Sequence, residues 1–192
     1  MKVEVSQASP AEIDADLLVV GLHEGGSLPE HLADAGGAAD ARGGYRKLAV
    51  LHPQGGGRAL AVGLGKREEM DAERARVAAA LAAKRAGELE ATSVAWLLPE
   101  GDDDEAIAEG IVTGTVLGAY RFDRFKSADP DDPKPPEIAS LTLLGPEAVS
   151  EAAEAASSSP ACLAAMAAAT LARSASISSR LPSPTASARP PP

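Results

Sequence analysis

The sequence predicts a three-layer α/β/α sandwich, in which helices pack on both faces of a mostly parallel sheet. Segments typical of strands alternate with segments typical of helices, and several strands are apolar along their whole length rather than at every second residue. The 192 residues are enough for one domain of ordinary size. Aromatic residues make up only 3% of the chain, so the core of this domain must be mostly aliphatic.

The first elements are two strands and a short helix. Residues 2–6 alternate between polar and apolar side chains and predict a short edge strand. Residues 16–21 are almost continuously apolar, which is typical of a strand buried on both faces. Residues 29–35 predict a short helix, with Ser27 as its N-cap and the Gly36-Gly37 pair at its end.

A hairpin and the strongest helix follow. Residues 47–52 and 58–63 predict two core strands, joined by the turn Pro53-Gln54-Gly55-Gly56-Gly57. Residues 71–89 then predict a long helix with an acidic start. The expected apolar face of this helix consists of Val77, Ala80, Leu81 and Ala83.

The pattern repeats in the second half. Residues 93–98 predict a buried strand, and residues 102–120 a helix that opens on four acids. Four prolines within residues 127–136 predict an extended loop. Residues 138–144 predict the last strand, and residues 146–156 a helix with proline in its first turn.

Composition changes abruptly after Ala156 and predicts a boundary there. Residues 157–192 contain no Asp, Glu, Lys or Gly, and 25 of these 36 residues are Ser, Ala or Pro. Such a stretch has too few large apolar residues to offset the entropy of ordering it. We therefore expect a folded domain at 1–156 and a disordered tail at 157–192, which is either a natural extension or the product of a shifted reading frame.

Charge and cysteine content exclude several classes of protein. Lys and Arg total 18 against 28 Asp and Glu, and this net charge of −10 argues against the broad basic surface typical of nucleic-acid binding, although local basic patches stay open. The single cysteine, Cys162, excludes an intramolecular disulfide and fits a reducing cytoplasm. Residues 1–7 lack the apolar core of a secretory signal, and residues 155–172 are too short and too rich in Ala and Ser to span a bilayer. We expect a cytoplasmic chain with no membrane segment.

A glycine-rich segment, Gly63-Leu64-Gly65-Lys66, stands between a predicted strand and a predicted helix, where a phosphate-binding loop would lie. Arg67 occupies the place at which such a loop needs Ser or Thr, and the dinucleotide-binding pattern lacks its third glycine. We therefore expect these glycines to allow a tight exit from the strand.

The acidic and histidine residues form no pattern typical of a metal site. Residues 102–105 are four consecutive acids that could hold a divalent cation, but acids at a helix start also cap free amides and complement the dipole, and we favour this second interpretation. His23, His31 and His52 lack the spacing of metal ligands on a helix. We assign no metal residue.

No residue is assigned to catalysis or to cofactor binding. The pattern Gly-x-Ser-x-Gly does not occur, and Cys162 lies in the tail, where we expect no packed surroundings to activate a thiolate. Trp96 is expected in the core, with its indole N–H bonded to one partner. Residues 120–126 combine aromatic and basic side chains, and we favour a helix end with solvated charges over a stacking surface for nucleic acid.

Two stretches carry a resemblance to a known family. Residues 62–69 read Val-Gly-Leu-Gly-Lys-Arg-Glu-Glu, and residues 109–126 read Glu-Gly-Ile-Val-Thr-Gly-Thr-Val-Leu-Gly-Ala-Tyr-Arg-Phe-Asp-Arg-Phe-Lys. With the order of the preceding strands, they resemble the amino-terminal domain of the leucyl aminopeptidases, also called cytosol aminopeptidases. The resemblance covers residues 2–156, and residues 120–126 are its most specific part.

The resemblance implies a macro-domain-like sandwich that precedes a separate catalytic domain. That domain belongs to a two-metal, usually hexameric, cytoplasmic exopeptidase, which uses zinc or manganese to release amino-terminal residues such as leucine. The expected partners are therefore the catalytic domain and further copies of the chain. The family's metal motifs, of the type Asn-Thr-Asp-Ala-Glu-Gly-Arg and Lys-Gly-x-x-Phe-Asp-Ser/Gly-Gly-Gly, do not occur here. We carry over no catalytic or metal residue, and expect the chain alone to be inactive.

The resemblance also bears on the tail and leaves two other functions open. The family continues towards its catalytic half where this chain enters the Ser, Ala and Pro tail, which favours a frameshifted or truncated product. A stand-alone module could instead hold an ADP-ribose-type nucleotide at the carboxyl ends of the strands, with residues 63–66 at the diphosphate. A DNA-binding accessory domain is the third reading, which the net charge of −10 argues against.

Overall fold

A computed structural model describes residues 1–99, 102–120 and 137–164 of the chain. The strands are β1 (Lys2–Ser6), β2 (Leu17–His23), β3 (Leu48–Leu51), β4 (Ala59–Gly65), β5 (Ser93–Leu97) and β6 (Ser140–Leu144). The helices are α1 (Glu30–Ala33), α2 (Ala72–Glu88), α3 (Asp104–Ala119) and α4 (Ser150–Ser157), with 3₁₀ turns at Ala38–Asp40, Arg67–Glu69 and Glu147–Val149. Every strand predicted from the sequence is present, whereas the predicted loop at residues 127–136 lies outside the described residues.

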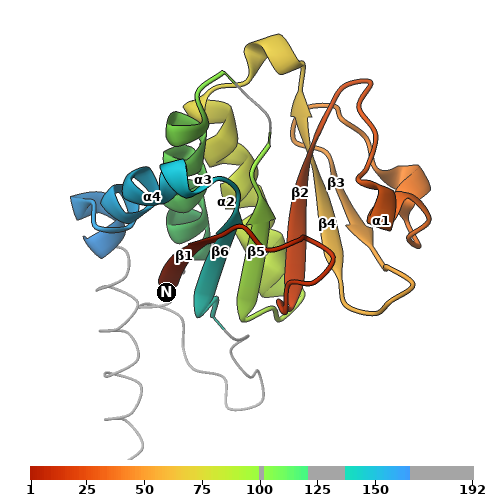
Figure 1. The fold of residues 1–192 in the computed structure, drawn as a ribbon, viewed down its shortest axis with the longest axis horizontal. Helices are drawn as coiled ribbons and strands as arrows, with labels where there is room; N and C mark the ends of the chain where they lie inside the picture. The colour runs from red at the N-terminus through yellow and green to blue at the C-terminus, as the bar shows by residue number, and fades with distance from the viewer. Residues whose placement is uncertain (100–101, 121–136, 165–192) are drawn as a thin grey trace, which may run out of the picture.

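The six strands form one sheet in the order β1-β6-β5-β2-β4-β3 (Figure 1). All neighbouring strands run parallel except β3 and β4, which form the predicted antiparallel hairpin, with Leu48 opposite Val62 and Leu51 opposite Ala59. Because parallel strands end on the same side, the carboxyl ends of β2, β4 and β5 share one edge of the sheet. We call this side the carboxyl edge.

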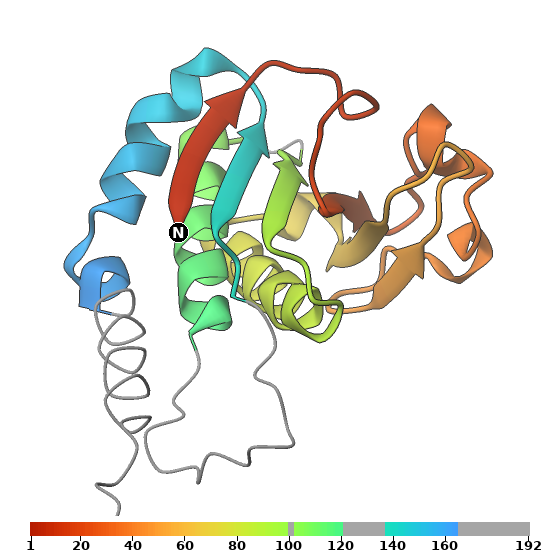
Figure 2. The same cartoon turned by 90° about the horizontal axis from the view of Figure 1, so that it is seen from below.

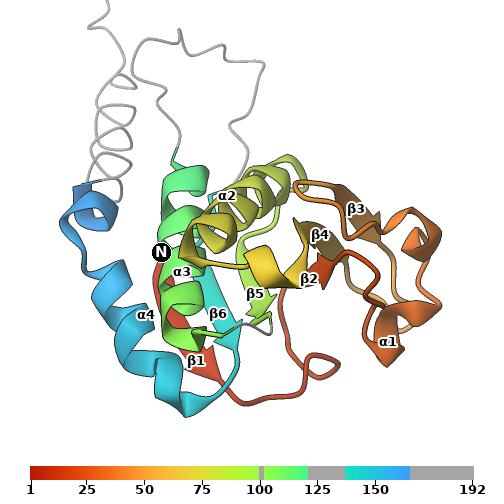
Figure 3. The same ribbon diagram turned by 90° about the horizontal axis from the view of Figure 1, so that it is seen from above.

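An apolar cluster lies on each face of the sheet, which confirms the predicted sandwich. Figures 2 and 3 show the elements that flank the sheet. Helices α2, α3 and α4 pack on one face and enclose the larger core. The other face carries a smaller cluster, in which Leu32 of α1 packs with residues of β2, β3 and β4. The loop between β1 and β2 adds Ile13 and Ala15 to this second cluster, so the second outer layer consists mostly of loop and short helix.

Helices α2 and α3 lie unusually close together because α3 presents a glycine in each successive turn. A Cβ atom on Gly110 would overlap the carbonyl oxygen of Ala72, and one on Gly114 would overlap the carbonyl oxygen of Arg76. A Cβ on Gly118 would lie 2.6 Å from the backbone of Ala80. The two backbones therefore touch directly along the whole contact.

The buried face of α2 differs from the predicted one. Of the expected face, only Ala83 is buried, whereas Val77, Ala80 and Leu81 are half-buried. The helix instead buries alanines, which are Ala75, Ala78, Ala79, Ala82, Ala83 and Ala86. The predicted face was therefore wrong at three of its four positions, because the glycines of α3 bring the two helices so close that the interface buries small side chains.

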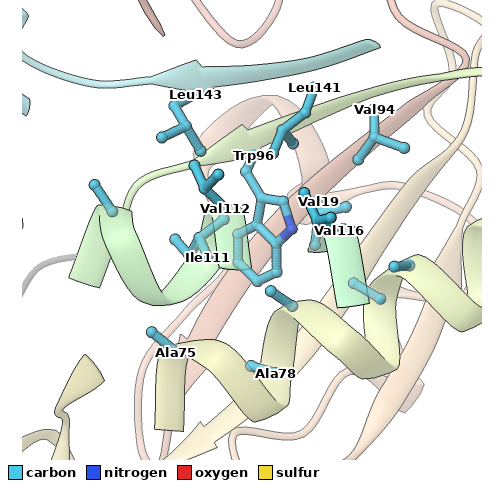
Figure 4. Close-up of a cluster of buried hydrophobic side chains, with 14 of the residues drawn as sticks. Val19, Ala75, Ala78, Val94, Trp96, Ile111, Val112, Val116, Leu141 and Leu143 are labelled. Carbon is cyan, nitrogen blue, oxygen red and sulfur yellow. The ribbon is translucent and has the colours of Figure 1, made fainter. Parts of the chain in front are cut away.

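Trp96 of β5 fills the centre of the larger core (Figure 4). Its side chain is 1% exposed, as expected for a core residue. The expected hydrogen bond is missing, because the indole N–H has no acceptor among the described residues. The neighbours drawn in Figure 4 are apolar: Val19, Ala75, Ala78, Val94, Ile111, Val112, Val116, Leu141 and Leu143.

The carboxylate of Asp16 ties the start of β2 to the start of β5. Its Oδ2 accepts hydrogen bonds from the Thr92 hydroxyl at 2.6 Å, the Thr92 backbone N–H at 2.8 Å and the Ser93 backbone N–H at 2.9 Å. The Asp16 N–H donates in return to the Ser93 hydroxyl at 2.8 Å. These bonds, the one from the Thr92 hydroxyl first, lower the pKa of Asp16 from 3.8 to about 2.

We expect Asp16→Asn to weaken the fold at neutral pH and to reduce its acid sensitivity. Because the folded-state pKa lies below the unfolded one, the carboxylate stabilises the fold above pH 3.8, and this contribution is lost as the pH falls towards 2. Asp16 is exposed, so we expect a loss of only about 1 kcal/mol at pH 7. Urea unfolding at pH 7, 4 and 2.5 measures it, with the exposed Asp14→Asn as control; equal losses at all three pH values would contradict the account.

Helix starts follow the capping rules at α2 and α3 but not at α1. Asp71 accepts a bond from the Arg74 N–H at 2.8 Å, as an acidic N-cap should. The prediction of Ser27 as the cap of α1 was wrong, because the helix begins at Glu30 with Pro29 as its cap and no side-chain cap bond. No helix among the described residues is both long and apolar enough to cross a membrane.

The chain remains packed on the domain after α4. A 3₁₀ turn that follows Pro146 leads into α4, and residues 160–164 form a further helical turn. Cys162 in this turn is fully buried in the larger core. The same core contains the small buried residues Ala153 and Ala156 of α4. The expectation that Cys162 lacks packed surroundings is therefore wrong, because small side chains suffice here to fill the space. The boundary after Ala156 stays a prediction.

Candidate functional site

The glycines of residues 63–66 lie at the carboxyl edge, where a loop of residues 42–47 folds onto the end of β4. A Cβ atom on Gly63 would overlap the carbonyl oxygen of Gly44, so this contact requires glycine. The Gly63 N–H donates to the Lys47 carbonyl at 2.7 Å, and the Gly65 N–H donates to the Gly43 carbonyl at 2.8 Å. Gly65 also has a φ of 81°, in the left-handed region.

These hydrogen bonds determine what the glycine segment can do. An anion-binding loop needs backbone N–H groups that point towards the ligand. The N–H groups of Gly63 and Gly65 are already bonded to the neighbouring loop. The glycines therefore serve the backbone of the strand exit, as the sequence predicts, and the geometry gives no support to a diphosphate site at residues 63–66.

Arg74 of α2 holds the same junction from the helix side. One guanidinium nitrogen donates to the Leu64 carbonyl at 3.3 Å, and another pairs with Glu69 at 2.6 Å. The guanidinium also stacks over the ring of Tyr45, 4.5 Å from its centre. Sequence reasoning missed this group, because nothing local connects Tyr45 with a helix so much later in the chain.

Charged side chains lie around this junction. Arg42, Arg46, Lys47 and Lys66 are all exposed, and we call these four residues the basic rim. Backbone bonds hold the rim together: the Arg46 N–H donates to the Gly63 carbonyl at 2.8 Å, beside the bond that Lys47 accepts. The exposed acids Glu24, Glu68 and Glu69 lie at the same junction, so this surface carries charges of both signs.

The acids before α3 act as helix-start residues. Asp103 is the N-cap and accepts a bond from the Ala106 N–H at 3.0 Å, while residues 102–105 are all exposed. This bond supports the capping interpretation. In the part of the chain that the structure describes, no group of three or more His, Cys, Asp or Glu side chains is placed to hold a metal ion.

The histidines have backbone partners or lie on the surface. His23 Nδ1 lies 3.4 Å from the Gly65 carbonyl oxygen, and the backbone of His52 forms a bridge with Gly36. His31 belongs to α1 and is exposed. Zinc or manganese, which the family resemblance implies for a whole enzyme, therefore finds no donor set among the described residues, and we place no metal there.

A shallow hollow of about 420 Å³ opens where β1, β5 and β6 end. Its walls include Leu97, Leu144 and Pro146, with Gln7 and Glu147 at the rim, and the Gln7 amide donates to the Glu147 carboxylate at 3.3 Å. One surface carboxylate with an amide partner does not make a catalytic arrangement. The predicted helix end at residues 121–126 lies outside the described residues.

Comparison with known proteins identifies the family. Residues 18–129 match the sequence model of the N-terminal domain of the cytosol aminopeptidase family. A probable cytosol aminopeptidase of Roseiflexus castenholzii is 39% identical and covers 80% of this chain, which in turn covers 32% of that relative. The corresponding protein of Geobacter sp. strain M21 is 32% identical, with 80% and 33% covered. The chain thus spans about a third of the length of these relatives.

Solved structures agree on the fold. A tomato leucine aminopeptidase mutant superposes with a TM-score of 0.63 at 20% identity, covering 81% of this chain and 35% of the other. The bottromycin maturation enzyme BotP in complex with Mn gives a TM-score of 0.54 at 28% identity, covering 74% and 30%. Since the family model matches more than half of the 192 residues, the chain belongs to the cytosol aminopeptidase family and corresponds to its N-terminal domain.

Proposed function

We propose that this chain serves as the non-catalytic accessory domain of a leucyl aminopeptidase, in which another part of the enzyme carries the chemistry. The observation that carries the proposal is the share of the family that this chain matches. The chain matches the model of the family's N-terminal domain, and it spans about a third of the length of its curated relatives. The two-metal removal of amino-terminal residues would then belong to the portion of these relatives that lies outside the matched segment. Zinc or manganese would bind in that portion.

The same proposal covers partners and location. The catalytic domain of the parent enzyme is the first partner, and further copies of the chain are the second, with the cytoplasm as the compartment. The family membership and the absence of a membrane-spanning helix among the described residues are compatible with this assignment. Nothing in the geometry favours the nucleotide-module or DNA-binding alternatives, since the glycine amides are bonded within the chain and the net charge is −10.

A domain exchange tests the proposal. In the Roseiflexus castenholzii relative, the matched segment is replaced by this chain, and the chimera is assayed for hydrolysis of leucine amide with Mn²⁺. We expect activity within about tenfold of the relative, because the active-site residues are unchanged, and no turnover above buffer for this chain alone. A chimera that carries Gly114→Val serves as the control for a misfolded domain.

Two outcomes would contradict the proposal. Metal-dependent turnover by the isolated chain would show that it carries a catalytic site of its own. A well-folded chimera with no activity, beside an active relative, would show that this chain does not serve the accessory role.

A further inference from the structure

We propose that the hollow at the ends of β1, β5 and β6 binds a small aliphatic amine in its protonated form, with the ammonium group on Glu147. The hydrocarbon part of the ligand would lie against the apolar wall of the hollow, which consists of Leu97, Leu144 and Pro146. The inference goes beyond the accessory role, because it concerns a ligand of this chain alone and needs no other part of an enzyme.

The first observation is the position and size of the hollow. It lies at the carboxyl ends of three parallel strands, where open α/β sheets bind their ligands, and its volume of about 420 Å³ suits a small molecule. Leu144 belongs to the smaller apolar cluster and Leu97 packs against it, so the hollow opens on that face of the sheet. Figure 1 shows that the helix of this face, α1, lies beside β3 and away from β1 and β6. Helix α1 therefore does not cover the hollow.

The second observation is the kind of hydrogen-bonding group that the hollow offers. Two of its N–H groups are already in use, since Ala8 donates to the Ser6 hydroxyl at 3.1 Å and Gly145 donates to the Ser6 carbonyl at 3.1 Å. The exposed Glu147 carboxylate accepts a bond from the Gln7 amide at 3.3 Å, and a carboxylate has room for several more. The lining therefore favours a ligand that donates hydrogen bonds.

The third observation is the charge of the chain around the hollow. Residues 1–16, 91–99, 102–120 and 137–164 include β1, β5, β6, α3 and α4, and they contain thirteen acids but one base, Lys2. Lys2 pairs with Glu4 at 2.5 Å. Ten basic residues lie instead within 42–85, which include β3, β4 and α2. The described surface around the hollow therefore favours a cation over an anion.

These observations together specify the ligand. Among the described residues, no group of three or more His, Cys, Asp or Glu side chains is placed to hold a metal ion, so an organic cation fits better. The apolar wall favours a cation that carries a branched aliphatic chain. Free leucine would bring its own carboxylate close to Glu147, and the two negative charges would repel each other. We therefore expect a simple amine, or the amino terminus of a peptide, whose carboxylate is distant.

Titration of the full chain with 3-methylbutylamine tests the inference, followed by NMR of the ¹⁵N-labelled protein at about pH 6.5, where the amine is protonated. We expect saturable shifts of the backbone N–H signals of Gln7, Gly145 and Glu147, with a Kd of about 1–10 mM, because one ion pair on an open surface contributes little. 3-Methylbutanol has the same hydrocarbon part without the charge, and it should bind at least tenfold more weakly.

Three variants separate the hollow from its surroundings, and their spectra show whether each is folded. Glu147→Gln removes the charge at the proposed site and should weaken binding of the amine at least tenfold. Glu154→Gln makes the same change of net charge at an exposed position of α4 outside the lining, and should leave the Kd within about twofold. Ala8→Phe should fill the hollow and weaken binding at least tenfold, although Glu147 keeps its charge.

Leucinamide and leucine distinguish the two sources of such a cation. Leucinamide that binds as tightly as the amine would assign the hollow to the amino terminus of a peptide, whereas leucinamide that binds more weakly would assign it to simple amines. Leucine itself should bind at least tenfold more weakly than 3-methylbutylamine, because of its carboxylate.

The absence of saturable shifts at the lining residues up to about 100 mM amine overturns the proposal. Equally tight binding of the alcohol, of leucine, or of the amine to the folded Glu147→Gln variant overturns it too, since the charge of Glu147 would then have no part in binding. None of these results affects the domain exchange, so failure of this inference and failure of the accessory role can be told apart.

Discussion

Gly114→Ala is expected to destabilise the domain by about 2–3 kcal/mol, although alanine is the better helix former by about 1 kcal/mol. The added methyl group would overlap the Arg76 carbonyl oxygen, which belongs to the backbone of α2 and cannot rotate away. The two helices must separate, and the alanines of α2 then lose their contacts with α3. Gly114→Val, with two more carbon atoms at the same point, should cost more than about 3 kcal/mol.

Gly87→Ala provides the control, because this glycine lies in α2 but a Cβ there meets nothing within 4 Å. We expect it to stabilise the fold by roughly 0.5–1 kcal/mol. Thermal unfolding followed by circular dichroism at 222 nm compares the three variants with the wild type. If Gly114→Ala and Gly87→Ala shift the melting temperature in the same direction, the close contact between α2 and α3 does not exist.

Trp96→Ala should cost about 3–5 kcal/mol, because it leaves a large cavity between the sheet and helices α2 and α3. Trp96→Phe should cost much less, about 1–2 kcal/mol. The phenyl ring keeps most of the buried apolar surface, and no hydrogen bond is lost, since the indole N–H has no acceptor among the described residues. Urea unfolding followed by circular dichroism measures both losses.

The fluorescence of the wild type gives an independent check, because Trp96 is the only tryptophan in the chain. A side chain that is 1% exposed should emit at short wavelength and resist quenching by acrylamide. A phenylalanine variant as unstable as the alanine variant would mean that the indole N–H makes a hydrogen bond that matters to the fold.

The comparison of α2 with the strands explains which features the sequence could predict. Strands such as residues 16–21 can be recognised by their large apolar side chains, and the hairpin of β3 and β4 can be recognised by its turn residues. Both could therefore be placed from the local sequence pattern. The buried face of α2 could not, because it consists of alanines, whose burial depends on the glycines of a helix that comes later.

The candidate site shows the same limit. The glycines at residues 63–66 could be recognised as a strand exit, since an incomplete motif is visible in the sequence itself. The packing of residues 42–47 against them, and the stacking of Arg74 on Tyr45, arise only when the sheet brings β2, β3 and β4 together. Cys162 was misjudged for a related reason, because a segment rich in small residues has a weak signal for burial yet fits tightly against an existing core.

The pairing of β1 with β6 has a consequence for the order in which this protein acquires its fold during synthesis. The sheet partner of Lys2 is Ser140, which is made 138 residues later. At about 5–20 residues per second, the ribosome needs roughly 7–28 s to supply that partner. By contrast, β2, β4, β5 and α2 have all been made once residue 97 is added, so they can pair and pack from that point. The nascent chain therefore carries β1 without its partner until β6 has been made, and we expect the sheet to close at β1 and β6 after the β2, β4 and β5 strands have paired.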